Sequence, residues 1–176
     1  MVDRHSMVKE RVMWVPPTAG MWKVNVDAAV LGDVGCGLGV VVRDDRGRVE
    51  RMGLQQVRDR WCPDVAEAMA AELGLKMAIQ MGLDNVVLES DSMALITMLK
   101  SKRFPTNYFG RAGKSVYSLA SSFHCIRFNF TRRDGNLVAH ELAHLMPIDY
   151  STQYWVGTIP ERIVPFVELD SVGLQS

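Results

Sequence analysis

Long hydrophobic runs are missing from this sequence. No apolar stretch approaches the ~18 residues that a membrane-spanning helix needs, so we expect no membrane association. The N-terminus carries charges throughout and has no apolar stretch of the kind found in secretory signals. Internal repeats and low-complexity segments are also absent. A chain of 176 residues with 48% apolar composition fits one ordinary domain with a substantial core.

Cysteine is also scarce. The three cysteines are Cys36, Cys62 and Cys125, an odd number at wide spacings with no C-x-x-C pair. This usage argues against a disulfide framework and is typical of reduced thiols in an intracellular protein. We therefore expect a nuclear or cytoplasmic location, with an organelle left open.

The sequence has no net charge, but its charges are segregated. Between Lys100 and Arg133 there are eight basic residues and no acidic one. Between Trp61 and Leu99 there are six acidic residues and Lys76 alone is basic. A locally basic strip can follow a phosphate backbone even on a neutral protein. A solvated surface would explain the same segregation equally well.

Apolar periodicity changes along the chain in a way that predicts a mixed α/β fold. After an arm at 1–19, alternating residues separated by turn-forming sequences indicate three strands. The segments that follow alternate between helix and strand, which is the rhythm of parallel crossover units. The predicted strands are 22–27, 38–43, 48–56, 85–88 and 125–131, and the predicted helices are 64–81, 92–99, 109–122 and 137–145.

A single mixed sheet flanked by helices follows from this order. The first three strands form an antiparallel meander, and the crossovers add parallel strands beside it. We assign the domain to 20–147 and expect 148–176 to pack on it as a C-terminal tail. Asp64 is expected to cap the first helix and Gly82 to end it.

Three acidic residues occupy informative positions. Asp27 lies in the first strand, on the face opposite its valines, and Asp91 follows the strand at 85–88. Glu67 is the one charged residue on a helix face otherwise made of small residues. A carboxylate packed against a sheet is costly unless it is paired or binds a metal, and oxygen clusters bind hard divalent cations. Glu89 shares the strand face of Asp91 and is expected in solvent at the sheet edge, with a place in the outer shell of the site as the alternative.

A series of motifs resembles one known family. The chain is similar to plant ribonuclease H-like domains related to those of non-LTR retroelements, over about residues 14–146. The motifs that carry this resemblance, in chain order, are Trp14-Val-Pro-Pro-Thr-Ala-Gly, Lys23-Val-Asn-Val-Asp27, Gly35-Cys-Gly-Leu-Gly-Val-Val-Val-Arg-Asp44, Ala66-Glu67-Ala-Met-Ala-Ala, Leu88-Glu-Ser-Asp91-Ser and Asn136-Leu-Val-Ala-His140-Glu-Leu-Ala143.

The resemblance implies a fold and an activity. The fold is a five-stranded mixed sheet of order 3-2-1-4-5 with strand 2 antiparallel, which brings Asp27 and Asp91 together opposite Glu67. These residues match the family's catalytic acids, and His140 stands at the place of a fourth metal-binding acid. The implied activity is hydrolysis of the RNA strand of RNA–DNA hybrids with two Mg²⁺ or Mn²⁺ ions, leaving a 5′-phosphate. An imidazole at the fourth position favours Mn²⁺ over Mg²⁺.

Basic residues near the implied site are candidates for nucleic-acid contacts. Arg132 and Arg133 adjoin it in sequence, and weaker candidates are Arg43, Lys100, Lys102 and Arg103.

Departures from the family pattern support an alternative. Ala28 replaces the usual glycine, and Met93 and Cys62-Pro63-Asp64 stand where bacterial members carry groove-binding polar residues. A non-catalytic module that binds nucleic acid or protein is therefore a second hypothesis.

One motif indicates a different chemistry. His140-Glu141-Leu-Ala-His144 fits the H-E-x-x-H pattern of zinc peptidases, in which two histidines one helical turn apart bind zinc. That site needs a third protein ligand, and no histidine follows His144, which leaves Glu161 and Glu168. The zinc metallopeptidase is a remote alternative, because the ribonuclease H-like resemblance accounts for the same residues.

Overall fold

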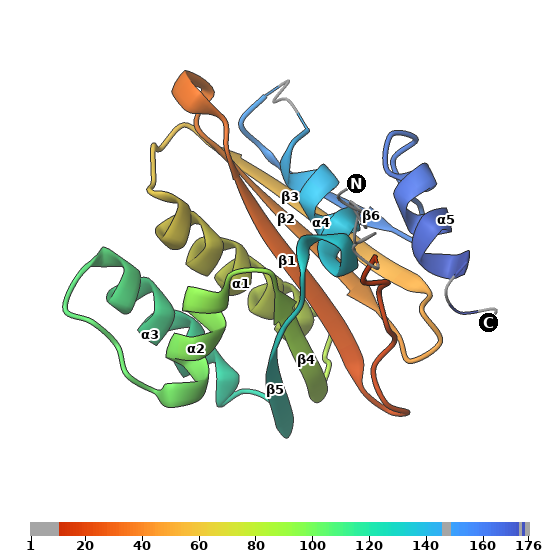
Figure 1. Ribbon diagram of the computed structural model, residues 1–176, viewed down its shortest axis with the longest axis horizontal. Coiled ribbons are helices and arrows are strands. Elements are labelled where there is room, and N and C mark those ends of the chain that lie inside the picture. The colour runs from red at the N-terminus through yellow and green to blue at the C-terminus, as the bar shows by residue number, and fades with distance from the viewer. Residues whose placement is uncertain (1–10, 146–148, 173, 175–176) are drawn as a thin grey trace, which may run out of the picture.

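A mixed sheet of six strands forms the centre of the computed structural model, which describes residues 11–145, 149–172 and 174 (Figure 1). The strand order is β5-β4-β1-β2-β3-β6. β1, β2 and β3 form the predicted antiparallel meander, and β4 and β5 continue the sheet in parallel with β1. The strands are β1 (Trp22–Val30), β2 (Cys36–Arg43), β3 (Val49–Val57), β4 (Asn85–Ser90), β5 (Cys125–Phe130) and β6 (Thr152–Val156).

The sixth strand corrects the predicted five-stranded sheet. The order 3-2-1-4-5 is confirmed for the first five strands, and β6 pairs antiparallel with the outer edge of β3. Its sequence, Thr-Gln-Tyr-Trp-Val, is rich in the β-branched and aromatic residues that favour strands. By pairing with β3, it satisfies backbone groups that an open edge would leave exposed.

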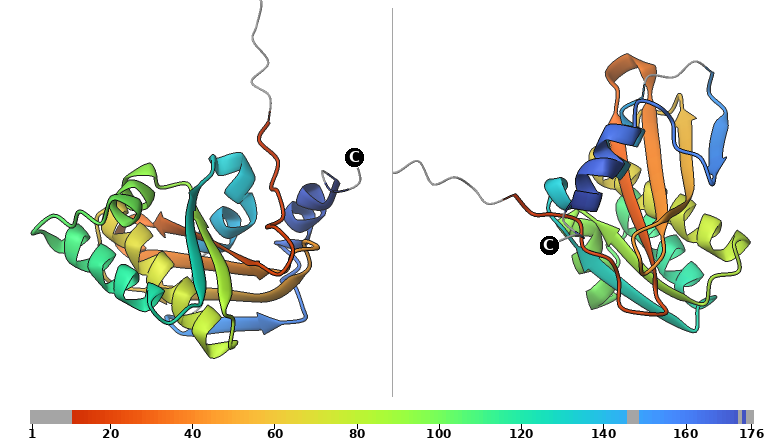
Figure 2. Two further views of the ribbon diagram at one scale, coloured as in Figure 1. Left: turned by 90° about the horizontal axis from the view of Figure 1, so that it is seen from below. Right: turned by 90° about the vertical axis from the view of Figure 1, so that its right-hand side faces the viewer.

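Helices cover both faces of the sheet (Figure 2). One face carries α1 (Pro63–Gln80), α2 (Met93–Ser101) and α3 (Tyr108–Ala120), and the other carries α4 (Leu137–Ala143) and α5 (Val164–Val172). Alternating residues of β2 contribute to the cores on both faces of the sheet. Val40 and Val42 belong to the core under α1, whereas Val41 belongs to the core under α4. Within the described residues, no helix combines the length and apolar character needed to cross a bilayer.

Two glycines allow the helices to approach the sheet closely. A Cβ at Gly74 of α1 would lie 2.7 Å from Cγ1 of Val26. A Cβ at Gly39 of β2 would lie 2.5 Å from the backbone oxygen of Ala139 in α4. Both distances are too short for carbon, so glycine is what permits this packing. α1 and α4 are thereby brought against β1 and β2 from opposite sides.

Element ends differ slightly from prediction. α1 begins at Pro63 after Cys62, so Asp64 lies in the first turn rather than at the cap, where its charge still favours the helix N-terminus. Gly82 ends the helix as predicted, with a φ of 69°. α4 ends at Ala143, two residues before the predicted end.

The described part of the N-terminal arm is packed against the sheet, which corrects the expectation of a loose segment. Trp14 is buried, and its indole Nε1 donates a hydrogen bond of 2.8 Å to Oδ1 of Asn25. The Arg43 guanidinium lies 4.3 Å from the Trp14 ring centroid. The arm therefore covers the polar face of β1.

Candidate metal and nucleic-acid site

Asp27 occupies the middle of the sheet. It lies in β1 between β2 and β4, opposite Gly39 of β2, and it is 1% exposed. In the parallel pairing of β1 with β4, Val26 stands beside Ser90, so Asp91 follows immediately at the carboxyl end of β4. Carboxyl ends of parallel strands are where such sheets place their sites. The register therefore sets Asp27 and Asp91 next to each other, as predicted.

Glu67 reaches this place from α1. The backbone N–H of Ala28 in β1 donates a hydrogen bond to its carboxyl group, whereas its Oε2 is buried and has no hydrogen-bond partner among the described residues. Asp27, Glu67 and Asp91 each offer an oxygen, and these oxygens lie within 4.8 Å of one another. The three acidic residues singled out in the sequence thus converge.

The electrostatics of the cluster favour a cation. Burial raises the pKa of Glu67 from 4.5 to about 10, and the neighbouring Asp27 charge adds to this rise. Burial and Asp27 also raise the pKa of Asp91, whereas the Arg133 guanidinium opposes that rise. Hard divalent cations prefer carboxylate oxygens, and one would both neutralise the cluster and give the buried Glu67 oxygen a partner. The residues present therefore fit such an ion.

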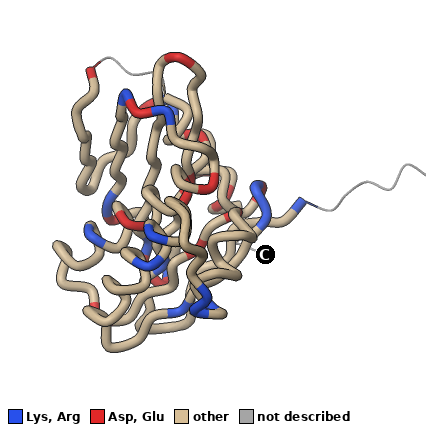
Figure 3. The backbone as a smooth tube through the Cα atoms, turned by 90° about the vertical axis from the view of Figure 1, so that its left-hand side faces the viewer, with Lys and Arg blue, Asp and Glu red and all other residues tan. Residues whose placement is uncertain are grey.

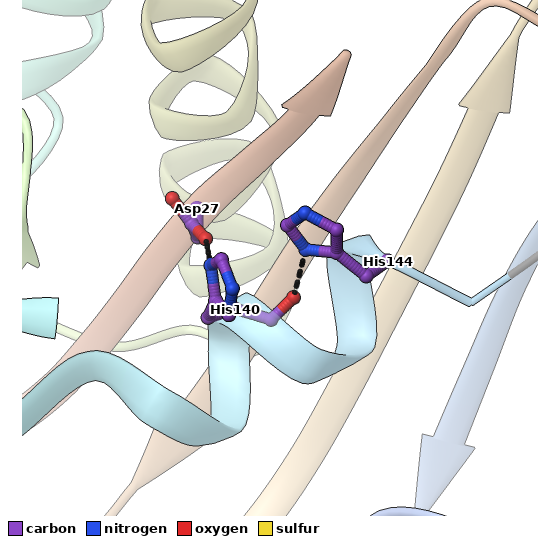
Figure 4. Close-up of side chains that lie close together, drawn as sticks. All are labelled: Asp27, His140 and His144. Atoms are coloured by element: carbon purple, nitrogen blue, oxygen red, sulfur yellow. Dashed lines mark hydrogen bonds and ion pairs between the residues drawn. The ribbon is translucent and has the colours of Figure 1, made fainter. Parts of the chain in front are cut away.

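His140 projects from α4 onto Asp27 (Figure 4). Its Nδ1 lies 2.7 Å from Oδ2 of Asp27, and the side chain is 17% exposed. The predicted fourth position thus lies beside the carboxylates, with its imidazole hydrogen-bonded to one of them. Asn136, which the sequence reading did not single out, holds the start of this helix, because its Nδ2 donates to the Val26 backbone oxygen at 2.9 Å.

Comparison with known proteins identifies the family. Residues 25–146 match the family model described as reverse transcriptase-like. The chain belongs to this reverse transcriptase-like family. The match confirms the resemblance to ribonuclease H-like domains that the sequence motifs indicate. Among curated proteins, no sequence matches this ribonuclease H-like chain.

Solved structures support the fold. Ribonuclease H1 from Halobacterium salinarum NRC-1 superposes with a TM-score of 0.65 at 22% identity, covering 70% of this chain and 94% of that one. The N-terminal RNase H domain of rv2228c from Mycobacterium tuberculosis gives 0.65 at 24% identity, covering 72% and 99%. LC11-RNase H1, solved with an RNA/DNA hybrid, gives 0.62 at 19% identity, covering 69% and 92%. At these identities the likeness establishes the ribonuclease H-like fold.

Two of the predicted phosphate contacts adjoin the carboxylates of this ribonuclease H-like domain. Nε of Arg133 lies 3.3 Å from Oδ2 of Asp91, and its side chain is 66% exposed. Arg132 precedes it and is exposed. Arg133 therefore lies at the rim of the acidic cluster, where a phosphate could replace Asp91 as the partner of its guanidinium.

The remaining exposed candidates lie farther along the chain. Lys100, Lys102 and Arg103 are exposed at the end of α2 and just after it. In the view of Figure 3, basic segments lie at several separate places along the described chain, with acidic segments among them. As contacts for nucleic acid, these lysines and Arg103 stay predictions.

Arg43 corrects a sequence prediction. It is 2% exposed, and its Nη1 lies 2.8 Å from Oδ2 of Asp170 in α5. A buried guanidinium engaged by a carboxylate and by the Trp14 ring cannot contact a nucleic-acid phosphate. Arg43 is buried because Asp170 of α5 and Trp14 of the arm, both distant from it in sequence, cover this face of the sheet.

Glu89 is also placed differently from its prediction. It is 3% exposed rather than in solvent, and it accepts hydrogen bonds of 3.0 Å from both Lys23 and Asn25. The side chain of Asn129 in β5 donates to it as well. Glu89 therefore belongs to a buried polar network on the same sheet face as Asp27, because β4 lies inside the sheet and Trp14 of the N-terminal arm packs over the neighbouring Asn25.

The histidine pair does not gain the third ligand expected for a zinc peptidase. Among the described residues, the grouping that contains both His140 and His144 takes Asp27 of β1 as its third member, rather than Glu161 or Glu168. The carboxylate comes from the ribonuclease H-like sheet.

Proposed function

We propose that this ribonuclease H-like domain is a divalent-metal-dependent endonuclease that hydrolyses the RNA strand of RNA–DNA hybrids. The observation that carries the proposal is the convergence of Asp27, Glu67 and Asp91 on one point, with a buried Glu67 oxygen that lacks a partner. Unpaired buried carboxylates are costly, and nothing in the packing of the fold requires these three to meet.

Different residues of the chain would hold the metal ions and contact the substrate. Asp27, Glu67 and Asp91 would hold two Mg²⁺ or Mn²⁺ ions through their oxygens, with His140 at the fourth position. The chemistry that bound ions supply in such sites is activation of water and stabilisation of the leaving oxygen of a phosphodiester. Exposed Arg132 and Arg133 would orient the scissile strand by contacting its phosphates.

A hybrid substrate is supported by the comparisons. The family model covers the segment that contains all four proposed ligands, and LC11-RNase H1 was solved with an RNA/DNA hybrid. A ribonuclease H-type reaction would leave a 5′-phosphate on the product. We propose a nuclear or cytoplasmic site of action, with organelles as the alternative.

Cleavage of a labelled RNA–DNA hybrid tests the proposal. The full chain is incubated with Mn²⁺ or Mg²⁺ beside Asp27→Asn, which keeps the side-chain shape but removes the shared charge. We expect 5′-phosphate products from the parent and none above background from the variant. The matched control is Asp33→Asn, which changes an exposed aspartate that does not belong to the cluster, and it should cleave like the parent.

A non-catalytic binding module is the second candidate. Met93 is 55% exposed two residues after Asp91, at a position where bacterial members of the resembled family carry a groove-binding polar residue. Hybrid binding with metal-dependent thermal stabilisation, but without cleavage by either ion, would favour this module and contradict the nuclease. Absence of both cleavage and metal-dependent stabilisation would overturn the metal site itself.

A further inference from the structure

His144 has no role in the proposed nuclease site, yet it lies against a residue that does. His140 lies in α4 and His144 caps the C-terminal end of that helix one turn later, and their ring centroids are 4.1 Å apart (Figure 4). His140 is partly buried against Asp27, whereas His144 is exposed. The pair therefore runs from the buried carboxylate to the protein surface.

The hydrogen bonds of the two imidazoles leave one nitrogen of each available. Nδ1 of His144 lies 2.8 Å from the backbone oxygen of His140, and Nδ1 of His140 lies 2.7 Å from Oδ2 of Asp27. A carbonyl oxygen only accepts, and so does an ionised carboxylate, so each Nδ1–H donates. Each Nε2 then carries a lone pair. Metal-ligating histidines are oriented in this way, with the second ring nitrogen donating to a carbonyl or carboxylate.

Donor atoms of Asp27, His140 and His144 lie within 4.8 Å of one another. Two imidazoles, one of them oriented by a carboxylate, suit borderline divalent ions such as Zn²⁺, Co²⁺ or Ni²⁺, whereas the all-carboxylate cluster of Asp27, Glu67 and Asp91 suits hard ions. Asp27 belongs to both groups. The two donor sets therefore overlap at Asp27, and His140 is also the fourth position of the proposed nuclease site, but the sets differ in the metal that they prefer.

We propose that His140, His144 and Asp27 form a separate site for a borderline transition-metal ion, and that filling this site opposes use of the carboxylate cluster by Mg²⁺ or Mn²⁺. The two histidines would be ligands through Nε2, and Asp27 would orient His140. The exposed ring of His144 gives the ion access from solvent. Binding of the ion does not depend on the proposed nuclease activity, whereas its inhibitory effect does rest on it.

Zinc binding to the metal-free full chain, measured by calorimetry, tests the site. His144→Asn removes one ligand at an exposed position, where folding is not at stake. We expect this variant to bind Zn²⁺ at least about tenfold more weakly than the parent, because even changes to outer-shell partners of a metal cost that much. His124→Asn is the matched control, since His124 is an exposed histidine outside the group, and it should bind zinc like the parent.

Two further measurements identify the site. With Co²⁺ as the probe, the parent should give the visible bands of nitrogen and oxygen ligation without thiolate charge transfer, and His144→Asn should lose them. Glu67→Gln, which alters only the carboxylate cluster, should keep zinc affinity while losing stabilisation by Mn²⁺. Equal zinc affinity of the parent and His144→Asn, or a thiolate spectrum with Co²⁺, would overturn the proposal.

The inhibitory effect is tested separately. Zn²⁺ added to a Mn²⁺-supported cleavage reaction should inhibit the parent and His124→Asn at a concentration about tenfold lower than it inhibits His144→Asn. Equal inhibition of all three would overturn the coupling between the sites. If the parent cleaves no hybrid at all, the nuclease assignment fails, while the calorimetric result still decides the zinc site.

Discussion

At the scale of single residues, the buried carboxyl group of Glu67 destabilises the metal-free protein. Its folded-state pKa of about 10 exceeds the ordinary value of 4.5, so the folded chain binds more protons than the unfolded chain between those values. The free energy of unfolding therefore falls as the pH rises through this window. A carboxyl group kept for function at such a position costs stability until a cation binds.

Glu67→Gln should accordingly stabilise the metal-free protein. Glutamine keeps the acceptor for the Ala28 N–H and removes the ionisation, so we expect a gain of about 3 kcal/mol in unfolding free energy at pH 7. The gain should shrink toward zero as the pH falls to 4.5. Urea unfolding in a chelator from pH 5 to pH 8 measures it.

Glu72→Gln is the matched control for that prediction. Glu72 lies on the same helix, where it pairs with exposed Lys76, and its replacement should change stability by less than about 1 kcal/mol without the rising trend. With Mg²⁺ present, the stability advantage of Glu67→Gln over the parent should shrink or reverse, because only the parent is stabilised by the ion. A gain for Glu67→Gln that is independent of pH would contradict burial of an ionisable group as its cause.

His140 determines the metal preference that we predict for cleavage. Its imidazole stands at the fourth ligand position, 2.7 Å from Asp27, and imidazole suits Mn²⁺ better than Mg²⁺. The parent should cleave faster with Mn²⁺, and His140→Asp should narrow the ratio of the two rates by about tenfold. Initial rates at saturating metal measure this ratio. Equal parent rates with both ions would argue against direct ligation by His140.

The residue scale also separates what the sequence could reveal from what it could not. Asp27, Glu67 and Asp91 were predictable, because strand register, a small helix face and the family motifs all select them. Arg43 was misplaced because Trp14 and Asp170, which are distant in sequence, cover it. Glu89 was misplaced because its hydrogen-bond partners come from the neighbouring strands β1 and β5. Local alternation indicates which face a side chain takes, but it does not reveal what covers that face.

At the scale of elements, the site depends on how closely α4 lies on β2. Gly39→Ala should disturb it, because the added methyl group would meet the Ala139 backbone oxygen at 2.5 Å and the Ala143 nitrogen at 2.8 Å. Backbone cannot turn aside as a side chain can, so the helix must shift and carry His140 away from Asp27. We expect a loss of about 1–3 kcal/mol in stability, measured by urea unfolding, together with weaker zinc binding.

Gly53→Ala provides the comparison for that substitution. It also adds a methyl group to a strand glycine, but its contact is the Met77 sulfur at 2.5 Å, at the flexible end of a side chain. Its cost should be smaller, and its zinc affinity should match that of the parent. If both alanine variants lost zinc affinity equally, displacement of α4 would not be the cause.

Prediction of elements succeeded where the periodic segment was long, and it failed where a short strand pairs with a strand distant in sequence. α1 was predictable within one residue at each end, because its small face and Gly82 mark it clearly. β6 was not predicted, because five residues on a sheet edge carry little signal of their own. Its partner, β3, lies about a hundred residues earlier, so only the folded sheet establishes the pairing.

At the scale of the whole molecule, a buried ion pair connects the C-terminal helix to the centre of the sheet. Arg43 of β2 and Asp170 of α5 are 2% and 3% exposed, and Trp14 of the arm lies over the guanidinium. Burial raises the pKa of Asp170 although Arg43 opposes the rise, and burial lowers the pKa of Arg43. Desolvation thus outweighs attraction for both partners, so the pair connects β2 to α5 without a large net gain in stability.

That balance gives a prediction with two parts. Asp170→Asn should lower the free energy of unfolding by about 3–5 kcal/mol, because it leaves a buried guanidinium charge uncompensated. Arg43→Met combined with Asp170→Leu should recover most of this loss, because the double variant buries no charge. Arg60→Gln removes one partner of a fully exposed pair with Asp33 and should leave urea unfolding unchanged. A double variant as unstable as Asp170→Asn would mean that α5 needs the ion pair itself, rather than only the absence of an unpaired charge.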